Sequence, residues 1–296
     1  MNKPSCNFRA GFDFPSRCLP LLIVGFLLVT CCNVFAQADP FESLFSQLRQ
    51  DGFSEDQIAI IRRSAGAPLF QTVSNTLHIR ESKLNYEQFL DPSRLNKAEQ
   101  FLQTHWSTLV RAEKGLGVDR TVIVAILLVE TQLGQYTGKT PTLAILSTFA
   151  LMDRESSRDA VWALLTEQDR THWGRDAFDR KMLQRSKWAY AELCALLQWS
   201  EAQGFSAESC RGSVMGAVGW PQFLPSSMVH YAMDGNHDGR IDLYTPQDAI
   251  FSVANYLRGH GWPQAKDQAA KEAVIYGYNK SQPYVQTVLE IASRIQ

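Results

Sequence analysis

One acidic side chain, Glu130, ends an otherwise apolar run of seven residues that begins at Val124. A helix through this run would place the Glu130 carboxylate in apolar surroundings, at the negative end of the helix dipole. Both effects disfavour the ionised form, so we expect the pKa of Glu130 to lie above its ordinary value. A carboxylic acid that keeps its proton near neutral pH can protonate the leaving oxygen of a glycosidic bond. The alternative is a solvent-facing glutamate paired with Arg120 or Lys139.

A second stretch, "GSVMGAVGWPQFLPSS" at residues 212–227, combines small residues with groups that bind sugars. Glycines let the backbone approach a ligand closely, and aromatic faces next to amides suit sugar rings. Ser213, Gln222, Trp220 and Phe223 are the candidates here. The alternative is a tight loop between helices, with both aromatic side chains in the core.

A third stretch, "DGNHDGRIDLYTPQD" at residues 234–248, has the spacing of a calcium-binding EF-hand loop. Oxygen ligands occupy its positions 1, 3 and 5, which are Asp234, Asn236 and Asp238. Gly239 stands at position 6, where the loop must turn sharply. Position 12 is Thr245 instead of the usual glutamate, but Asp248 could complete the site. We expect a structural calcium ion here; the alternative is a metal-free turn that leads into a helix beginning near Thr245.

Most of the chain has helical patterns, so helices must position these three stretches. A capping box at Ser54–Gln57 opens one helix, and Ser93 opens another. Asp119 is expected to cap the helix that carries Glu130, and Gly134 to end it. Further helical patterns cover roughly residues 142–152, 157–168, 176–203, 246–260 and 283–295. No segment longer than a few residues alternates as a half-buried strand would, so we expect a mainly α fold.

The first 38 residues have the pattern of a secretory signal peptide. Three basic residues precede an apolar run that ends in the small-residue pattern Ala36-Gln37-Ala38; they are Lys3, Arg9 and Arg17. An uncleaved membrane anchor is one alternative. A lipoprotein acylated at Cys31 is less favoured, because Thr30 is bulky for the position before such a cysteine.

Composition excludes a nucleic-acid binder. The chain has 296 residues, 45% of them hydrophobic, which is enough to build a sizeable core. Removal of residues 1–38 takes away three of 29 basic and one of 30 acidic residues, which leaves a formal net charge of −3 and no basic patch. Two cysteines, Cys194 and Cys210, remain; a disulfide and two buried thiols are both open.

The motifs together resemble the membrane-bound lytic murein transglycosylase B family, in the same order and over roughly residues 40–296. They are "VETQLGQYTGKT", "GSVMGAVGWPQFLPSS", the 234–248 loop with the helix after it, and "YGYNKSQPYV". The resemblance implies that Glu130 is the sole catalytic acid and base. It also implies a saccharide groove lined by Ser213, Gln222, Phe223, Tyr278, Asn279, Tyr284 and Tyr86. In the metal loop it implies Asp248 and the Arg240 carbonyl as further ligands.

The activity implied is non-hydrolytic cleavage of the bond between N-acetylmuramic acid and N-acetylglucosamine in peptidoglycan, which forms a 1,6-anhydro sugar. No second carboxylate suggests itself as a partner, which fits a reaction in which the substrate's own hydroxyl replaces water. A hydrolytic muramidase and a catalytically silent peptidoglycan-binding scaffold are the alternatives. Departures from the family pattern at Leu133, Arg154-Glu155 and Pro221 favour the scaffold, whereas the retained Glu130 favours an enzyme.

The expected organisation is a signal peptide at 1–38, an N-terminal helical region at 39–118, and a lysozyme-like catalytic domain at 119–296 with an EF-hand-like loop subdomain near 234–248. Such a protein would act in the periplasm on peptidoglycan glycan strands, without an organic cofactor. Cell-wall synthesis or secretion machinery is the expected protein partner.

Overall fold

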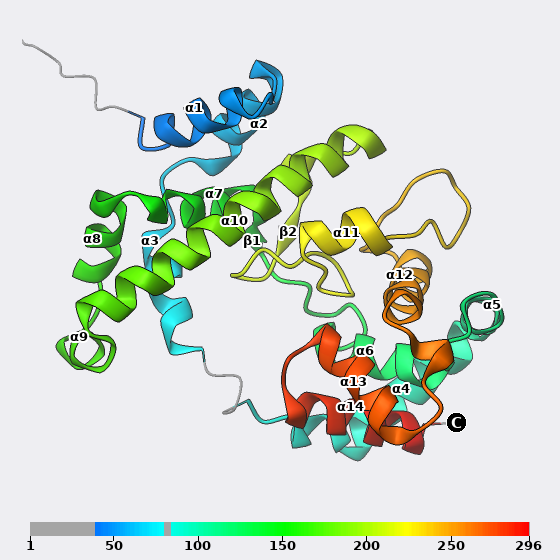
Figure 1. Ribbon diagram of the computed structural model, residues 1–296. Helices are drawn as coiled ribbons and strands as arrows, with labels where there is room; N and C mark the ends of the chain where they lie inside the picture. Colours follow the sequence, from blue (N-terminus) through cyan, green and yellow to red (C-terminus); the bar gives the residue numbers. More distant parts are fainter. Residues whose placement is uncertain (1–38, 80–83, 296) are drawn as a thin grey trace, which may run out of the picture. The chain divides into compact units, whose positions relative to one another are not determined.

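Helices make up nearly all of the regular structure in the computed structural model (Figure 1), which describes residues 39–79 and 84–295. The predicted signal peptide, with its alternatives, lies outside the described residues. From the N-terminus to the Glu130 helix the elements are α1 (Glu42–Gln50), α2 (Glu55–Ala65), α3 (Phe70–Asn75), η1 (Thr76–His78), η3 (Glu87–Leu90), α4 (Pro92–Thr104), α5 (Trp106–Leu116) and α6 (Arg120–Thr131). The middle of the chain forms β1 (Thr140–Pro141), α7 (Thr142–Ala150), η4 (Leu151–Asp153), α8 (Glu155–Ala163), α9 (Glu167–Trp173) and α10 (Arg175–Gln203). The remaining elements are η5 (Ala207–Ser209), β2 (Arg211–Gly212), α11 (Pro225–Tyr231), α12 (Pro246–Gly259), η6 (Trp262–Gln264), α13 (Gln268–Tyr278) and α14 (Gln282–Arg294).

The capping box at the start of α2 is confirmed. The Ser54 hydroxyl accepts the backbone N–H of Gln57 at 3.3 Å, and the Gln57 side-chain oxygen accepts the backbone N–H of Ser54 at 2.9 Å. Each residue therefore satisfies a backbone donor that the first helical turn leaves without a partner. The mainly α prediction holds for the same reason: short-range signals of this kind fix where helices begin.

Several predicted boundaries were wrong by a few residues or more. The helix predicted to open at Ser93 begins at Pro92, with the Asp91 carboxylate accepting the Ser93 N–H at 2.9 Å. The pattern over 157–168 is divided between α8 and α9. The prediction also missed α13, whose apolar face is narrow, so that only Val274 and Ile275 are buried.

Asp119 does not cap the Glu130 helix as predicted. Its carboxylate accepts hydrogen bonds from the Trp262 indole at 3.1 Å and from the Lys271 ammonium at 3.2 Å. The backbone N–H of Arg120 is bonded by the Glu113 carboxylate at 3.1 Å instead. The Asp119 carboxylate thus bonds to residues far along the chain and not to the first turn of the helix.

The two short strands bring distant segments together. β1 and β2 pair antiparallel, with Thr140 opposite Gly212. Beyond β2 the chain folds back through bridges between Gly212 and Val218 and between Val218 and Phe223, so residues 212–223 form a compact loop beside β1.

α6 lies inside the core, since every residue from Val122 to Val129 is buried. It packs against α4, α12 and α14, while α7 packs against α2 and α10. Residues from Asp39 onward form one compact unit, and helices from both sides of the predicted 118/119 boundary contribute to its core. Within the part of the chain described, no helix combines the length and apolarity needed to span a bilayer. The Cys194 and Cys210 thiols are not joined.

Candidate active site

Glu130 stands at the end of α6, where the chain leaves the core. Its side chain is half-buried, and its Oε1 accepts a hydrogen bond from the Tyr284 hydroxyl of α14 at 2.7 Å. Arg120, the partner considered in the alternative, instead forms an ion pair with Glu113. α6 and α14 pack directly against each other, so this bond joins two core helices at the site. The expected rise in the pKa of Glu130 stays a prediction.

Glu130 faces a cavity of about 300 Å³. The residues that line it are Leu84, Asn85, Tyr86, Gln88, Phe89, Val129, Glu130, Asn279 and Tyr284. Four residues predicted from the sequence therefore meet here: Glu130, Tyr86, Asn279 and Tyr284. Among the described residues that line the cavity, Glu130 carries the only carboxylate. The surrounding groups are hydroxyls, amides and apolar side chains, which suit an uncharged polar ligand.

A pair of tyrosines shapes the wall beside Glu130. The Tyr86 and Tyr284 rings meet edge to face with their centroids 5.9 Å apart, and both are buried. Burial, followed by the nearby charge of Glu130, raises the pKa of the Tyr284 hydroxyl well above its usual value. That hydroxyl keeps its proton and remains a hydrogen-bond donor to the carboxylate.

Tyr278 holds the neighbouring loop in place. Its hydroxyl donates to the carbonyl oxygen of Pro221 at 2.6 Å, and burial followed by the charge of Glu130 raises its pKa well above the usual value. Pro221 lacks a backbone donor, as expected, but its carbonyl ties the 212–223 loop to α13. Tyr278 therefore acts as an anchor for the loop.

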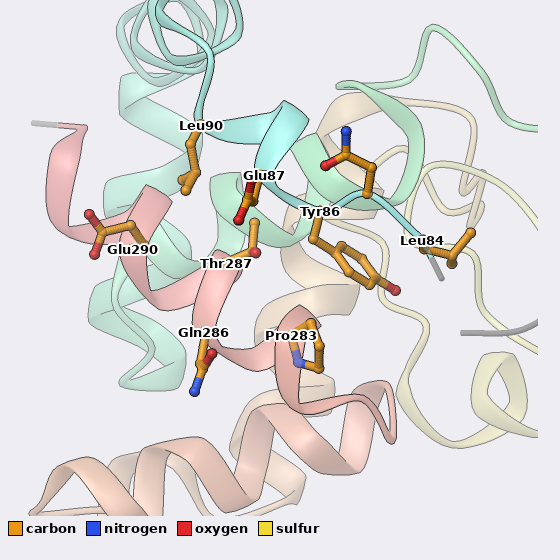
Figure 2. A pocket seen from close by; sticks show the side chains of 9 residues that line it. Leu84, Tyr86, Glu87, Leu90, Pro283, Gln286, Thr287 and Glu290 are labelled. Carbon is orange, nitrogen blue, oxygen red and sulfur yellow. The ribbon is translucent and has the colours of Figure 1, made fainter. Parts of the chain in front are cut away.

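Figure 2 shows a second cavity, of about 440 Å³, between η3 and α14. It shares Leu84, Asn85 and Tyr86 with the Glu130 cavity, so the two spaces lie on either side of a common wall. Glu87 from η3 and Glu290 from α14 line this second space, and Glu290 is paired with Arg294. The carboxylates of Glu87 and Glu290 therefore line a cavity separate from that of Glu130.

Ser213 is held by the loop's own backbone. Its hydroxyl oxygen accepts the N–H groups of Met215 at 3.2 Å and of Ala217 at 3.1 Å. Because two donors occupy the oxygen, its hydrogen can be donated to a ligand. Ser213 is not among the described residues that line the Glu130 cavity, so its predicted contact with the saccharide stays a prediction.

Gln222 joins the loop to the turn that follows Glu130. Its side-chain nitrogen donates to the carbonyl oxygens of Thr137 at 3.1 Å and Gly219 at 2.8 Å. The residue has φ +49°, a left-handed conformation that costs energy for a residue with a side chain. Both amide hydrogens are used within the fold, so only the amide oxygen is left for a ligand.

Glycines allow this turn and loop to touch. A methyl group on Gly134 would lie 2.0 Å from Cε2 of Trp220, and one on Gly138 would lie 2.1 Å from the carbonyl oxygen of Gly212. Both glycines also have positive φ, at +84° and +89°. The glycines after Glu130 therefore let the backbone of this turn pack against the Trp220 ring and the backbone of Gly212.

Phe223 does not line the groove surface. Only 2% of it is exposed, and its ring packs against Tyr256 and Tyr278 with centroids 5.7 and 6.0 Å away. The ring supports the wall from behind, as in the alternative of a core aromatic residue. Trp220 likewise packs on Phe101, with centroids 5.9 Å apart.

Leu133 and Arg154, which depart from the family pattern, lie outside the Glu130 cavity. Leu133 has φ +60° and packs partly buried against the core, one residue after Gln132, which also has positive φ. The Arg154 guanidinium turns toward the N-terminal segment, where it lies 3.3 Å from the Ser43 hydroxyl. Neither side chain lines the Glu130 cavity.

The 234–248 loop adopts an EF-hand-like turn. Asp234 accepts the N–H groups of His237 at 2.6 Å and of Gly239 at 2.8 Å, and Asp238 accepts that of Arg240 at 2.9 Å. Gly239 has φ +83°, as the sharp turn at position 6 requires.

Asp248, the predicted last ligand of the loop, is bonded to the loop backbone. Asp248 accepts the N–H of Gly235 at 2.9 Å with one oxygen and that of Asp242 at 2.7 Å with the other. Burial raises its pKa despite these bonds. Over residues 39–79 and 84–295, no three His, Cys, Asp or Glu side chains lie close enough together to hold a metal ion. The oxygen donors are of the type that calcium prefers, and their side chains also accept backbone N–H groups of the loop.

Sequence reasoning missed Asn85 and Gln88, which line the Glu130 cavity. No motif marks them. Asn85 lies just before η3 and Gln88 lies within it, so both reach the cavity through the packing of η3 on α14.

Residues 36–273 of the chain match a family model described as Transglycosylase SLT domain. The chain is also 31% identical over 184 residues to membrane-bound lytic murein transglycosylase B of Escherichia coli (strain K12). That match covers 62% of this chain and 43% of the relative, so the chain spans less than half of the relative's length.

Solved structures share the fold. Soluble lytic transglycosylase SltB1 of Pseudomonas aeruginosa matches with a TM-score of 0.66 at 23% identity, over 86% of this chain and 97% of that one. Escherichia coli Slt35, solved in complex with calcium, matches with a TM-score of 0.67 at 23% identity, over 88% and 94%. Pseudomonas aeruginosa SltB3, solved with NAG-anhNAM-pentapeptide, matches with a TM-score of 0.67 at 21% identity, over 85% and 78%.

Proposed function

Because the chain belongs to the transglycosylase SLT domain family, we propose that it cleaves the glycan strands of peptidoglycan between N-acetylmuramic acid and N-acetylglucosamine without consuming water. One observation carries this proposal. Glu130, held by the Tyr284 hydroxyl at 2.7 Å, is the only carboxylate among the described residues that line its cavity. A hydrolase of the usual kind needs a second carboxylate, either to activate water or to attack the sugar.

In the proposed first step, protonated Glu130 donates its proton to the glycosidic oxygen as the bond to C1 of the muramic acid breaks. The bond electrons leave with the departing sugar, which becomes an alcohol. The ring carries the positive charge that develops. Because Tyr284 occupies Oε1, we assign the donating role to Oε2, which leaves one oxygen for orientation and one for chemistry.

In the proposed second step, the Glu130 carboxylate takes the proton of the muramic acid 6-hydroxyl while that oxygen bonds to C1. The product is a 1,6-anhydro ring, and Glu130 returns to its protonated form. The Tyr284 hydroxyl stabilises the carboxylate between the steps, because a charge-assisted hydrogen bond favours the ionised form. Asn279 lines the same cavity, and we infer that its amide binds the sugar there.

Ser213 is proposed to orient the substrate's N-acetyl group. Its oxygen already accepts two backbone N–H groups, so the hydroxyl hydrogen is available for the acetyl carbonyl. An oriented acetyl group would stabilise the positive ring. A Ser213→Ala variant that kept full turnover would rule this role out.

The chemistry is tested by incubating purified peptidoglycan with the protein in water labelled with heavy oxygen, followed by mass spectrometry of the soluble products. The proposed reaction gives anhydromuramic ends without the label, and Glu130→Gln gives none. A hydrolytic muramidase would place the label at the new reducing ends. A folded protein that sediments with peptidoglycan but releases nothing would be a binding scaffold.

We infer that the helices after residue 119 form a lysozyme-like core and that residues 39–118 are a helical region around the groove. A peptidoglycan substrate and the predicted signal peptide favour the periplasm. Fractionation of cells that express the full chain tests this location, and N-terminal sequencing of the mature protein tests cleavage after Ala38.

Calcium at residues 234–248 is proposed as a structural ligand only, with no part in the chemistry. The ligands would be Asp234, Asn236, Asp238, the Arg240 carbonyl and Asp248. A ligand that binds only the native state raises the melting temperature with its concentration. Wild-type protein should therefore melt higher in millimolar calcium than in chelator, and Asp238→Asn should lose that difference. Equal melting temperatures for wild type in both buffers would rule out the proposed calcium site.

A further inference from the structure

Tyr136 is an aromatic residue with no partner inside the fold. It is 66% exposed, more than any other large hydrophobic or aromatic residue described as exposed. Within residues 39–79 and 84–295 its ring and hydroxyl make no ring contact and no hydrogen bond. A single exposed aromatic side chain is ordinary on a protein surface, so its exposure alone carries little weight.

Hydrogen bonds hold the backbone turn that presents Tyr136 on both sides. The Tyr136 N–H donates to the carbonyl oxygen of Thr131 at 3.0 Å, one residue after Glu130. On its other side, the Thr137 carbonyl accepts the Gln222 amide at 3.1 Å. Gly134, within the same turn, lies against the Trp220 ring. Bonds on both sides therefore fix the backbone of Tyr136 relative to the end of the Glu130 helix.

The turn also lies beside the loop that carries the sugar-binding candidates. Gly138 packs against the Gly212 carbonyl, directly before Ser213. Val214, the next residue of that loop, is 36% exposed. The exposed Tyr136 and Val214 and the hydroxyl of Ser213 thus belong to a turn and a loop that pack against each other.

We infer that Tyr136 is a sugar-binding platform, on which a pyranose ring of the glycan strand stacks as it enters the groove. An aromatic face suits the apolar face of a sugar ring, and neighbouring hydroxyl and amide groups suit its hydroxyls. Because the backbone that presents the ring is already hydrogen-bonded, only the Tyr136 side chain has to lose conformational entropy on binding. This inference rests on the proposed action on glycan strands, and it identifies the sugar ring, not the peptide, as the group that Tyr136 recognises.

The test uses soluble glycan strands from which the stem peptides have been removed, with anhydromuramic ends as the readout. Tyr136→Ala should raise KM roughly tenfold and leave kcat within about twofold, whereas Tyr136→Phe should stay close to wild type. Tyr276→Ala is the matched control. Tyr276 is a 43% exposed tyrosine on α13, two residues before Tyr278, so it points to the opposite side of that helix.

The outcomes separate this inference from the proposed reaction. If wild type forms anhydro products and Tyr136→Ala has the same KM, the platform is refuted while the reaction stands. If wild type forms no product, co-sedimentation with peptidoglycan decides. A Tyr136→Ala protein that binds less than Tyr276→Ala supports the platform without the reaction, and equal binding refutes the platform. Unchanged thermal melting of Tyr136→Ala shows that the fold is intact.

Discussion

The hydrogen bond from Tyr284 to Glu130 should be worth a large part of the catalytic rate. Tyr284→Phe removes one oxygen atom and keeps the ring that fills the space between α6 and α14. The lost bond is 2.7 Å long and has a carboxylate acceptor, and 1% of Tyr284 is exposed, so water cannot easily replace the hydroxyl. Hydrogen bonds to charged groups contribute about 1.5–3 kcal/mol.

If that free energy orients the carboxyl group in the transition state, its loss lowers kcat by roughly 10- to 150-fold, since about 1.4 kcal/mol corresponds to a factor of ten. The fold should lose less, because Glu130 is protonated in the proposed resting state and the bond then joins two neutral groups. A buried hydrogen bond contributes about 1 kcal/mol to the free energy of unfolding, which lowers the melting temperature by about 2–4 °C in a chain of this size.

Tyr256→Phe is the matched control. The Tyr256 hydroxyl donates to the Gly277 carbonyl at 2.8 Å, and the residue is 9% exposed, so a similar bond is lost away from Glu130. Initial rates of anhydro-product release, together with melting temperatures, are compared for the three proteins. Similar melting losses with a slow Tyr284→Phe enzyme are expected. A Tyr284→Phe rate equal to that of Tyr256→Phe would refute the reasoning that this bond positions the acid.

Three further outcomes are expected. Gly134→Ala should lower the free energy of unfolding by about 2–4 kcal/mol, measured by urea denaturation, because its methyl group would lie 2.0 Å from the Trp220 ring at φ +84°; an unchanged midpoint would mean that the ring moves aside freely. Above about pH 10, stability should fall as pH rises, because Tyr278 and Tyr284 keep their protons in the native state and lose them when unfolded, so the native state binds more protons. The melting temperature of Tyr284→Phe should fall less steeply with rising pH than that of wild type, and equal slopes would contradict this. The Cys210 thiol, whose pKa burial raises to about 12, should react with iodoacetamide at pH 8 much more slowly in the folded than in the denatured protein, as mass spectrometry of the alkylated chain would measure; equal rates would show that the thiol is accessible.

Short-range patterns in the sequence determined much of the fold. The Ser54 capping box and the continuous apolar run before Glu130 predicted real helices, because caps and helical faces are formed by residues only three or four positions apart. The same run identified Glu130 as an acid at the edge of a core. The glycines around Ser213 predicted close approach of the backbone to a ligand, and that stays a prediction; the close contacts of Gly134 and Gly138 are with Trp220 and Gly212.

Other features depended on which helices pack together, and the sequence could not supply them. The sequence predicts Asp119 as a helix cap, but its carboxylate bonds to Trp262 and Lys271 instead. It also predicts Phe223 in the groove, but packing buries the ring. Asp248 likewise bonds backbone amides that precede it in the chain.

The decisive contact of the site is of the same kind. Tyr284 lies 154 residues from Glu130 along the chain, and no local pattern links them. Their meeting follows from the packing of α14 on α6, whose buried faces fix the two helices against each other. The sequence by itself therefore determined the acid and the helix that carries it. Only the tertiary structure decided what holds that acid in place, because a hydrogen bond between distant residues exists only after the core has brought their helices together.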